Sequence, residues 1–135
     1  MDDEDYDADH APDPERWLSM DESERLLAVD RYHARNPHPP APSPTLHVGM
    51  HVIVESQIAA GDPPITAATL QRLIAEGLTR HEAVHAVAGA VSHMMFEMLK
   101  KGVPFDPVAY QRDLEQMSAA KWRASGTKPR KRKRR

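Results

Sequence analysis

Cysteine is absent from this chain of 135 residues, so no disulfide bond can form within it and nothing indicates an oxidising compartment. Apolar runs of the roughly 20 residues that a membrane-spanning helix needs are also missing. The first residues are acidic, whereas a secretory leader begins with basic and then apolar residues. We therefore expect a soluble, cytoplasmic protein with no membrane partner.

Signals for β-strands are lacking as well, because no stretch alternates between apolar and polar residues and no Asn-Gly pair marks a hairpin. Helical spacing of apolar residues, bounded by capping residues, prolines and glycines, recurs along the chain instead. The expected helices are about 15–36 (with a capping box near Ser19 that favours a break), 44–60, 66–77, 79–101 and 106–123. The sequence predicts an all-α fold, a small antiparallel bundle of four to five helices.

The two ends of the chain carry opposite charge. Residues 1–15 contain eight acidic side chains and no lysine or arginine until position 16, whereas residues 128–135 are almost all basic. Such runs repel themselves and bury no apolar surface. We predict disordered arms at 1–14 and 125–135, around a helical domain at 15–124 that contains a proline-rich linker at 37–44.

The basic tail has the composition of a non-specific nucleic-acid contact, and an acidic partner is the alternative. Self-association into a homodimer is a further option. The tail residues predicted to make the nucleic-acid contact are Lys128, Arg130, Lys131, Arg132, Lys133, Arg134 and Arg135.

Histidines recur four residues apart in two of the predicted helices. His47 and His51 lie in the segment 44–60, and His81 and His85 lie in the segment 79–101. Residues four apart share one side of a helix. The segment 44–60 is apolar nearly all round, which is typical of a buried helix, and buried imidazoles need a partner. We predict that these two helices are adjacent and that their histidine pairs hold one divalent metal ion.

Three other side chains are candidates for additional ligands: Glu55, Glu82 and His93. The carboxylates would either complete the coordination or orient the imidazole rings. An imidazole-rich set favours zinc or nickel. A single histidine is more often a hydrogen-bonded core residue, so the alternative is a metal-free adaptor domain with a buried polar network.

Three histidines in polar or proline-rich surroundings are expected to be solvated: His10, His33 and His38.

Residues 81–85 read His-Glu-Ala-Val-His, which matches the zinc-peptidase pattern in which Glu82 would be the general base. The pattern is short, and the spacing to His93 does not fit the metzincin extension. No sheet is predicted to form a peptidase cleft. Glu82 also lies three residues after Thr79, where it would complete a capping box. These observations argue against a zinc peptidase and leave enzymatic activity open.

The stretch 43–117 resembles a small bacterial family, the domain of unknown function 1841. The resemblance is carried by Pro44, Leu46, His47, His51, Glu55, Gln57, His81, Glu82, His85 and the segment from Asp106 to Tyr110. Two positions differ from the family pattern: Val84 precedes the last histidine where many members have an acid, and Ser56 separates Glu55 from Gln57. The resemblance implies a site built on the paired histidines, and it implies no particular activity.

Overall fold

The computed structural model describes residues 6–35 and 44–126, with the side chains of residues 44, 45, 125 and 126 excepted. Over these residues the chain forms seven helices and no strand, which confirms the predicted all-α class. The helices are α1 (Pro14–Ser19), α2 (Glu22–Arg35), α3 (Pro44–Ala60), α4 (Pro64–Ala75), α5 (Arg80–Lys101), α6 (Pro107–Gln116) and α7 (Ala119–Gly126).

Two of the predicted helices are each divided into two. Asp21 and Glu24 exchange side chain–backbone hydrogen bonds of 2.8 Å and so begin α2 afresh after α1. Ser118 accepts a hydrogen bond of 3.1 Å from the backbone of Lys121 and begins α7 in the same manner. A local capping side chain therefore stops a helical pattern that the apolar spacing alone would continue.

Helix α5 has the clearest ends in the chain. Thr79 and Glu82 form a complete capping box at its start, as predicted. At its end Gly102 adopts a φ of 65°, a left-handed conformation that glycine takes without a Cβ clash, and its N–H donates to the carbonyl of Met98. These caps set the register in which α5 presents His81 and His85 to the rest of the domain.

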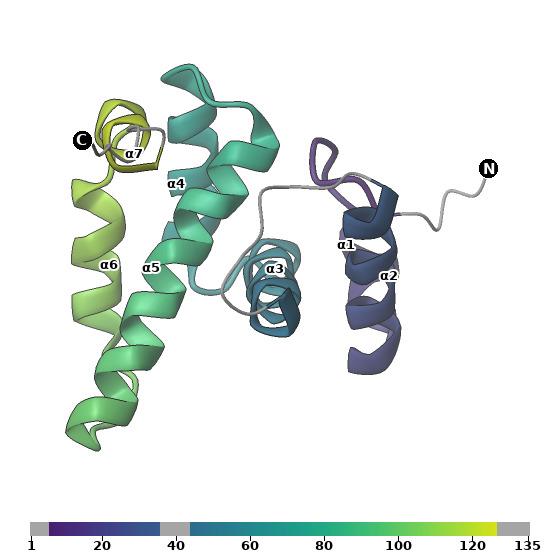
Figure 1. Cartoon of the computed structure of the whole chain (residues 1–135), viewed down its shortest axis with the longest axis horizontal. Helices are drawn as coiled ribbons and strands as arrows, with labels where there is room; N and C mark the ends of the chain where they lie inside the picture. The colour runs from purple at the N-terminus through teal and green to yellow at the C-terminus, as the bar shows by residue number, and fades with distance from the viewer. Residues whose placement is uncertain (1–5, 36–43, 127–135) are drawn as a thin grey trace, which may run out of the picture.

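Helix α3 occupies the centre of the domain. In Figure 1 it is seen nearly end-on, with α4, α5 and α6 on one side and α1 and α2 on the other. The contact between α3 and α5 is the most extensive contact between any two of the described helices. The predicted adjacency of the two histidine-bearing helices is therefore confirmed. A helix surrounded in this way has to be apolar on most sides, which explains its sequence.

Two apolar clusters pack against different faces of α3. Met50 and Val54 join the larger one, which includes Leu70, Leu73, Val84, Val87, Tyr110 and Leu114. Val48 and Val52 join the smaller one, which includes Tyr6, Trp17, Val29 and Tyr32. At the helical repeat, the stripe of residues 47, 51 and 55 lies between these two faces. His47, His51 and Glu55 therefore face the junction where α2 and α5 approach α3.

The N-terminal segment departs from the predicted disordered arm. Tyr6 is 4 % exposed and Ala8 is fully buried, although both lie in the acidic run. The ring of Tyr6 packs against Trp17 and Tyr32, with centroid separations of 5.8 and 5.4 Å. Aromatic burial at this single position offsets the surrounding charge, because an aromatic side chain removes a large apolar area from water.

Residues 1–5, most of the proline-rich linker and the basic tail from residue 127 lie outside the described residues, so the predictions for them remain predictions. Within the part of the chain that the structure covers, none of the helices combines the length and apolar character that crossing a membrane requires.

Candidate metal centre

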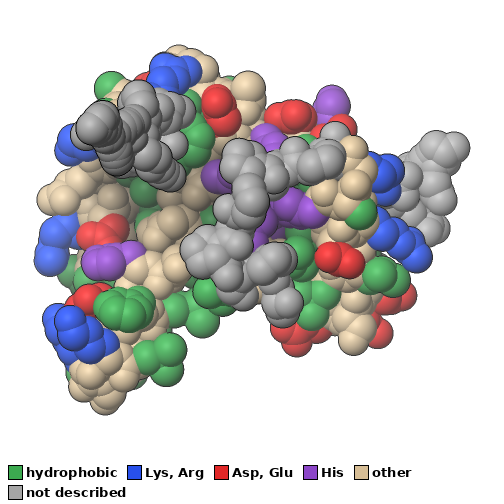
Figure 2. Space-filling view, in the orientation of Figure 1, with side chains coloured by type: hydrophobic (Ala, Val, Ile, Leu, Met, Phe, Trp, Pro, Cys, Tyr) green, Lys and Arg blue, Asp and Glu red, His purple; other side chains and the backbone are tan. Residues whose placement is uncertain are grey.

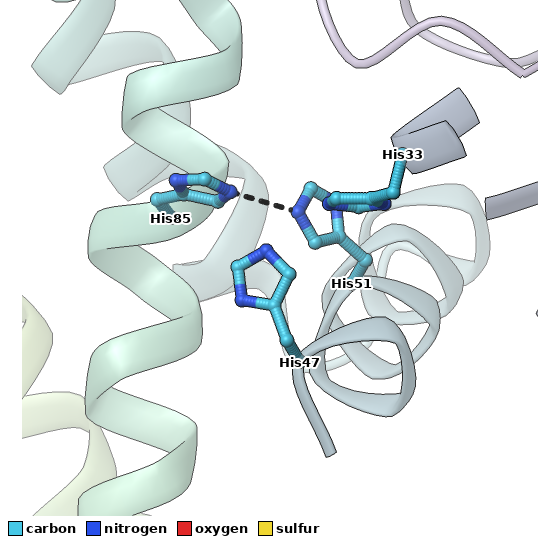
Figure 3. A group of neighbouring side chains, drawn as sticks. All are labelled: His33, His47, His51 and His85. Atoms are coloured by element: carbon cyan, nitrogen blue, oxygen red, sulfur yellow. Dashed lines mark hydrogen bonds between the residues drawn. The ribbon is translucent and has the colours of Figure 1, made fainter. Parts of the chain in front are cut away.

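Four histidine side chains converge at the junction of α2, α3 and α5. His33 comes from α2, His47 and His51 come from α3, and His85 comes from α5 (Figure 3). One ring nitrogen of each lies within 4.8 Å of the corresponding nitrogens of the other three. His51 is fully buried and the other three are half-buried. In the space-filling view, histidine side chains are visible between α5 and the α1–α2 side of the molecule (Figure 2).

His51 lies at the centre of this group. Its ring centroid is 4.7 Å from that of His33, 5.0 Å from that of His47 and 4.9 Å from that of His85. Its Nε2 atom lies 3.0 Å from Nε2 of His85. The two nitrogens face each other across the α3–α5 contact, so both helices present ligand atoms to one small volume.

The other ring nitrogen of His51 faces a chain of buried polar groups. Its Nδ1 lies 3.3 Å from the hydroxyl of Tyr6, and that hydroxyl donates to Oε2 of Glu55. Glu55 is also held by both guanidinium nitrogens of Arg80, at 2.8 Å each. Since the Tyr6 proton is committed to the carboxylate, the Tyr6 oxygen accepts from Nδ1–H of His51. Nε2 of His51 therefore carries the lone pair, directed at the other histidines.

His33 is held in the same tautomer by a different partner. Its Nδ1 lies 2.9 Å from the carbonyl oxygen of Val29, one helical turn earlier in α2. A carbonyl oxygen can only accept, so Nδ1 carries the proton and Nε2 carries the lone pair. Two of the four histidines thus have their tautomers set by groups outside the cluster, as ligating histidines commonly do.

A fifth histidine, His81, adjoins the four. Its Nε2 lies 3.1 Å from Nε2 of His85, and its Nδ1 lies 3.3 Å from the hydroxyl of Tyr32. The centroids of the His81 and His33 rings are 6.5 Å apart, so His81 flanks one side of the cluster. The structure therefore brings together three of the four predicted ligands and places the fourth beside them.

The electrostatic environment favours a neutral imidazole at His51. Burial lowers the pKa of His51 far below its ordinary value of 6.5, and the neighbouring rings of His85, His33, His47 and His81 lower it further. Burial and the adjacent Glu55 carboxylate raise the pKa of Tyr6, so the phenol keeps its proton. A neutral imidazole is the form that binds a metal ion, and it binds without first losing a proton.

The three additional candidates lie elsewhere. The Glu55 carboxylate binds Arg80 and the Tyr6 hydroxyl, and Tyr6 lies between it and His51. The Glu82 carboxylate accepts from the backbone N–H of Thr79 at 2.9 Å, which is the capping role. His93 is exposed further along α5, near Asp113 at 3.6 Å and Glu97 at 3.9 Å. None of the three belongs to the group of mutually close ligand atoms found among the described residues.

His33 corrects the expectation that it would be solvated. It lies four residues after Val29 and one after Tyr32, both of which are buried on the apolar stripe of α2. That stripe is readable in the sequence as apolar residues at helical spacing, and it places His33 on the inner face. Asn36 and Pro37, which follow shortly after His33, favoured the interpretation that His33 lies in a polar, solvent-exposed segment. His10 is exposed as expected, and His38 lies outside the described residues.

The geometry allows a single transition-metal ion to bind. Imidazole nitrogens bind zinc tetrahedrally at about 2.0–2.1 Å, so neighbouring nitrogens of such a site are about 3.3–3.4 Å apart. The widest separation in the cluster, 4.8 Å, exceeds this distance by about 1.4 Å. Rotation of the His47 and His85 rings can bring their nitrogens closer, whereas His33 and His51 are already held by their second hydrogen bonds.

The fold and this cluster define the chain as an all-helical domain with a polyhistidine centre joining three helices. The family model of the domain of unknown function (DUF1841) matches residues 11–116, well over half of the chain, so the protein belongs to that family. The match extends further toward the N-terminus than the predicted resemblance at 43–117 and includes α1 and α2. Comparison with curated proteins found no match, and neither did comparison with solved structures.

Proposed function

We propose that this protein binds one divalent transition-metal ion through His33, His47, His51 and His85. Zinc and nickel are the preferred ions because imidazole nitrogen suits both. The observation that carries the proposal is the mutual approach of four imidazole nitrogens, drawn from three helices, within 4.8 Å. Buried imidazoles gathered without a ligand would cost free energy through their desolvation, and an ion offsets that cost.

An ion at this place would join the two sides of the domain. His33 belongs to the side formed by α1 and α2, whereas His85 belongs to α5 on the other side of α3. Binding that requires all three helices in place stabilises the folded chain relative to the unfolded one. At a free-ion concentration of 100 times the dissociation constant, the gain is about 2.7 kcal/mol. We therefore propose a structural role for the ion, with histidines filling the coordination.

The test is metal titration of the full chain after chelation, followed by thermal unfolding with and without zinc or nickel. We expect one equivalent to bind and to raise the melting temperature. His85→Ala should remove most of both effects. His93→Ala is the matched control, because it lies on the same helix, is exposed and is outside the cluster. Equal binding by the two variants would contradict the proposal.

A second candidate is the metal-free adaptor domain, which the hydrogen bonds inside the cluster favour. With the lone pair on Nε2 of His51, the Nε2–H of His85 can donate to it across 3.0 Å. Such a bond would satisfy these two rings without an ion. The basic tail at 128–135 would then supply contacts with nucleic acid or an acidic partner. Under this reading chelation leaves the melting temperature unchanged.

A further inference from the structure

The N-terminal segment 6–9 contacts the surroundings of the histidine cluster at three separate points. The Tyr6 hydroxyl contacts His51 and Glu55. The carbonyl oxygen of Ala8 accepts from Arg80 at 3.0 Å. Asp9 accepts from the backbone N–H of His81 at 3.1 Å, in the first turn of α5. The contacts of Ala8 and Asp9 thus join the N-terminal segment to the start of α5, 72 positions further along the chain, beside the cluster.

Tyr6 stands between a cluster histidine and a buried ion pair. The Glu55 side chain is fully buried and that of Arg80 is 9 % exposed. Glu55 accepts the Tyr6 proton, which leaves the phenol oxygen as the acceptor for His51. The resulting chain runs from Arg80 through Glu55 and Tyr6 to His51. It matches the arrangement in which a group beyond the ligand fixes the ring orientation and tautomer of a ligating histidine.

We propose that Tyr6 is a positioning residue of the metal centre, and that metal binding and docking of the segment 6–9 stabilise each other. The inference rests on the proposed function and goes beyond it, because it assigns a role to a segment that supplies no ligand. Coupling of this kind is reciprocal: if the docked segment raises metal affinity by some factor, the bound metal favours docking by the same factor.

A purely structural role for Tyr6 makes a different prediction. Tyr6 packs on Trp17 and Tyr32, so its loss could lower stability through packing alone. Tyr6→Phe retains the ring and removes only the hydroxyl. Tyr110→Phe is the matched control, because Tyr110 is equally buried and its hydroxyl donates to Gln57 at 2.9 Å in the larger apolar cluster. Both changes remove one buried hydroxyl, but only the first touches a cluster histidine.

The decisive measurement is the zinc dissociation constant, obtained by competition with a chromophoric chelator for the full chain and each variant. Tyr6→Phe should weaken zinc binding by about 10- to 100-fold, the range typical of groups that orient a ligating histidine. Tyr110→Phe should change it by less than about twofold. Asp9→Ala, an exposed change that loosens the segment without touching the phenol, should give a smaller loss in the same direction. It keeps the test available if Tyr6→Phe does not fold.

The reciprocal measurement is hydrogen exchange at the backbone amides of residues 7–10. Zinc should slow this exchange in the original chain and should leave it unchanged in His85→Ala. Equal zinc affinity in the original chain, Tyr6→Phe and Asp9→Ala would overturn the inference while leaving the metal site intact. Absence of zinc binding by the original chain would instead overturn the proposed function, so the two failures are distinguishable.

Discussion

Two buried tyrosines, Tyr110 and Tyr6, contact polar side chains of α3, and they lie in regions of different polarity. Tyr110 of α6 donates to Gln57 and lies 3.3 Å from the Thr66 hydroxyl, so all its polar partners are neutral. Tyr6 of the N-terminal segment contacts Glu55 and His51, next to the Arg80 guanidinium. The interior of the region around α4–α6 is held by apolar burial with a few neutral hydrogen bonds, and its Arg72–Glu76 ion pair lies at the partly exposed margin. The region between α2, α3 and α5 gathers titratable groups, of which His51 and Glu55 are buried and the other histidines are half-buried.

The difference shows which region is organised for stability alone. An apolar cluster gains free energy from every buried methylene, and a few neutral hydrogen bonds are enough to satisfy its polar atoms. Five imidazoles, a carboxylate and a guanidinium incur large desolvation costs in the same volume. A protein that needed only a stable core would gain from apolar residues there, which supports a binding role for the histidine side of α3.

The largest effect is expected from breaking the buried ion pair. Glu55→Gln removes the charge that compensates Arg80, and leaving a buried charge without compensation costs about 3–5 kcal/mol in the free energy of unfolding. Urea unfolding of the metal-free chain measures it. The double variant Glu55→Gln, Arg80→Met should lose less than the two single losses added together. If the two single losses in the free energy of unfolding simply add up in the double variant, Glu55 and Arg80 do not stabilise each other.

A comparable or somewhat smaller effect is expected in the apolar region. Leu73 is fully buried in the larger cluster, so Leu73→Ala should cost about 2–5 kcal/mol through lost burial and the cavity left behind. Zinc affinity should stay unchanged in this variant as long as it remains folded. A large loss of zinc affinity would mean that the two regions are not separable.

Acidification should destabilise the metal-free protein through the histidine region. Because the pKa of His51 is lowered on folding, the unfolded chain binds a proton below about pH 6.5 that the folded chain does not bind. The contribution of His51 is therefore fully present above that pH and falls by about 1.4 kcal/mol per pH unit below it. Urea unfolding between pH 7 and 5 measures the slope. His51→Gln should reduce the slope, and an unchanged slope would show that His51 does not cause the loss of stability on acidification.

The smallest effect is expected at Glu82. Because its carboxylate caps the start of α5, Glu82→Ala should cost about 1 kcal/mol in stability and leave zinc affinity unchanged. A loss of zinc affinity beyond that of His93→Ala would instead make Glu82 a ligand. The comparison separates the capping role from the peptidase-like reading of residues 81–85.

The sequence permits prediction of the helical class, of both ends of α5 and of the adjacency of α3 and α5, because caps and apolar spacing act locally. It also indicates that His47, His51, His81 and His85 lie near one another, although His81 is not one of the four mutually close histidines. It does not reveal His33 or Tyr6 as members of that neighbourhood. Their positions depend on how α2 and the N-terminal segment pack on α3, which are contacts between residues far apart in the sequence. The acidic residues around Tyr6 and the proline-rich residues after His33 favour exposed segments instead. His81, one helical turn from His85, contacts His85 but lies at the edge of the cluster, with its ring centroid 6.5 Å from that of His33.

The most direct test of the proposed metal centre is X-ray absorption spectroscopy of the zinc-loaded full chain at neutral pH. We expect a first shell of nitrogen ligands at about 2.0–2.1 Å, with the outer-shell scattering of four imidazoles. His85→Ala should lose one imidazole from that pattern, and His93→Ala should leave it unchanged. A spectrum dominated by oxygen ligands, or one that His85→Ala leaves unaltered, would contradict the claim that these four histidines form the metal centre.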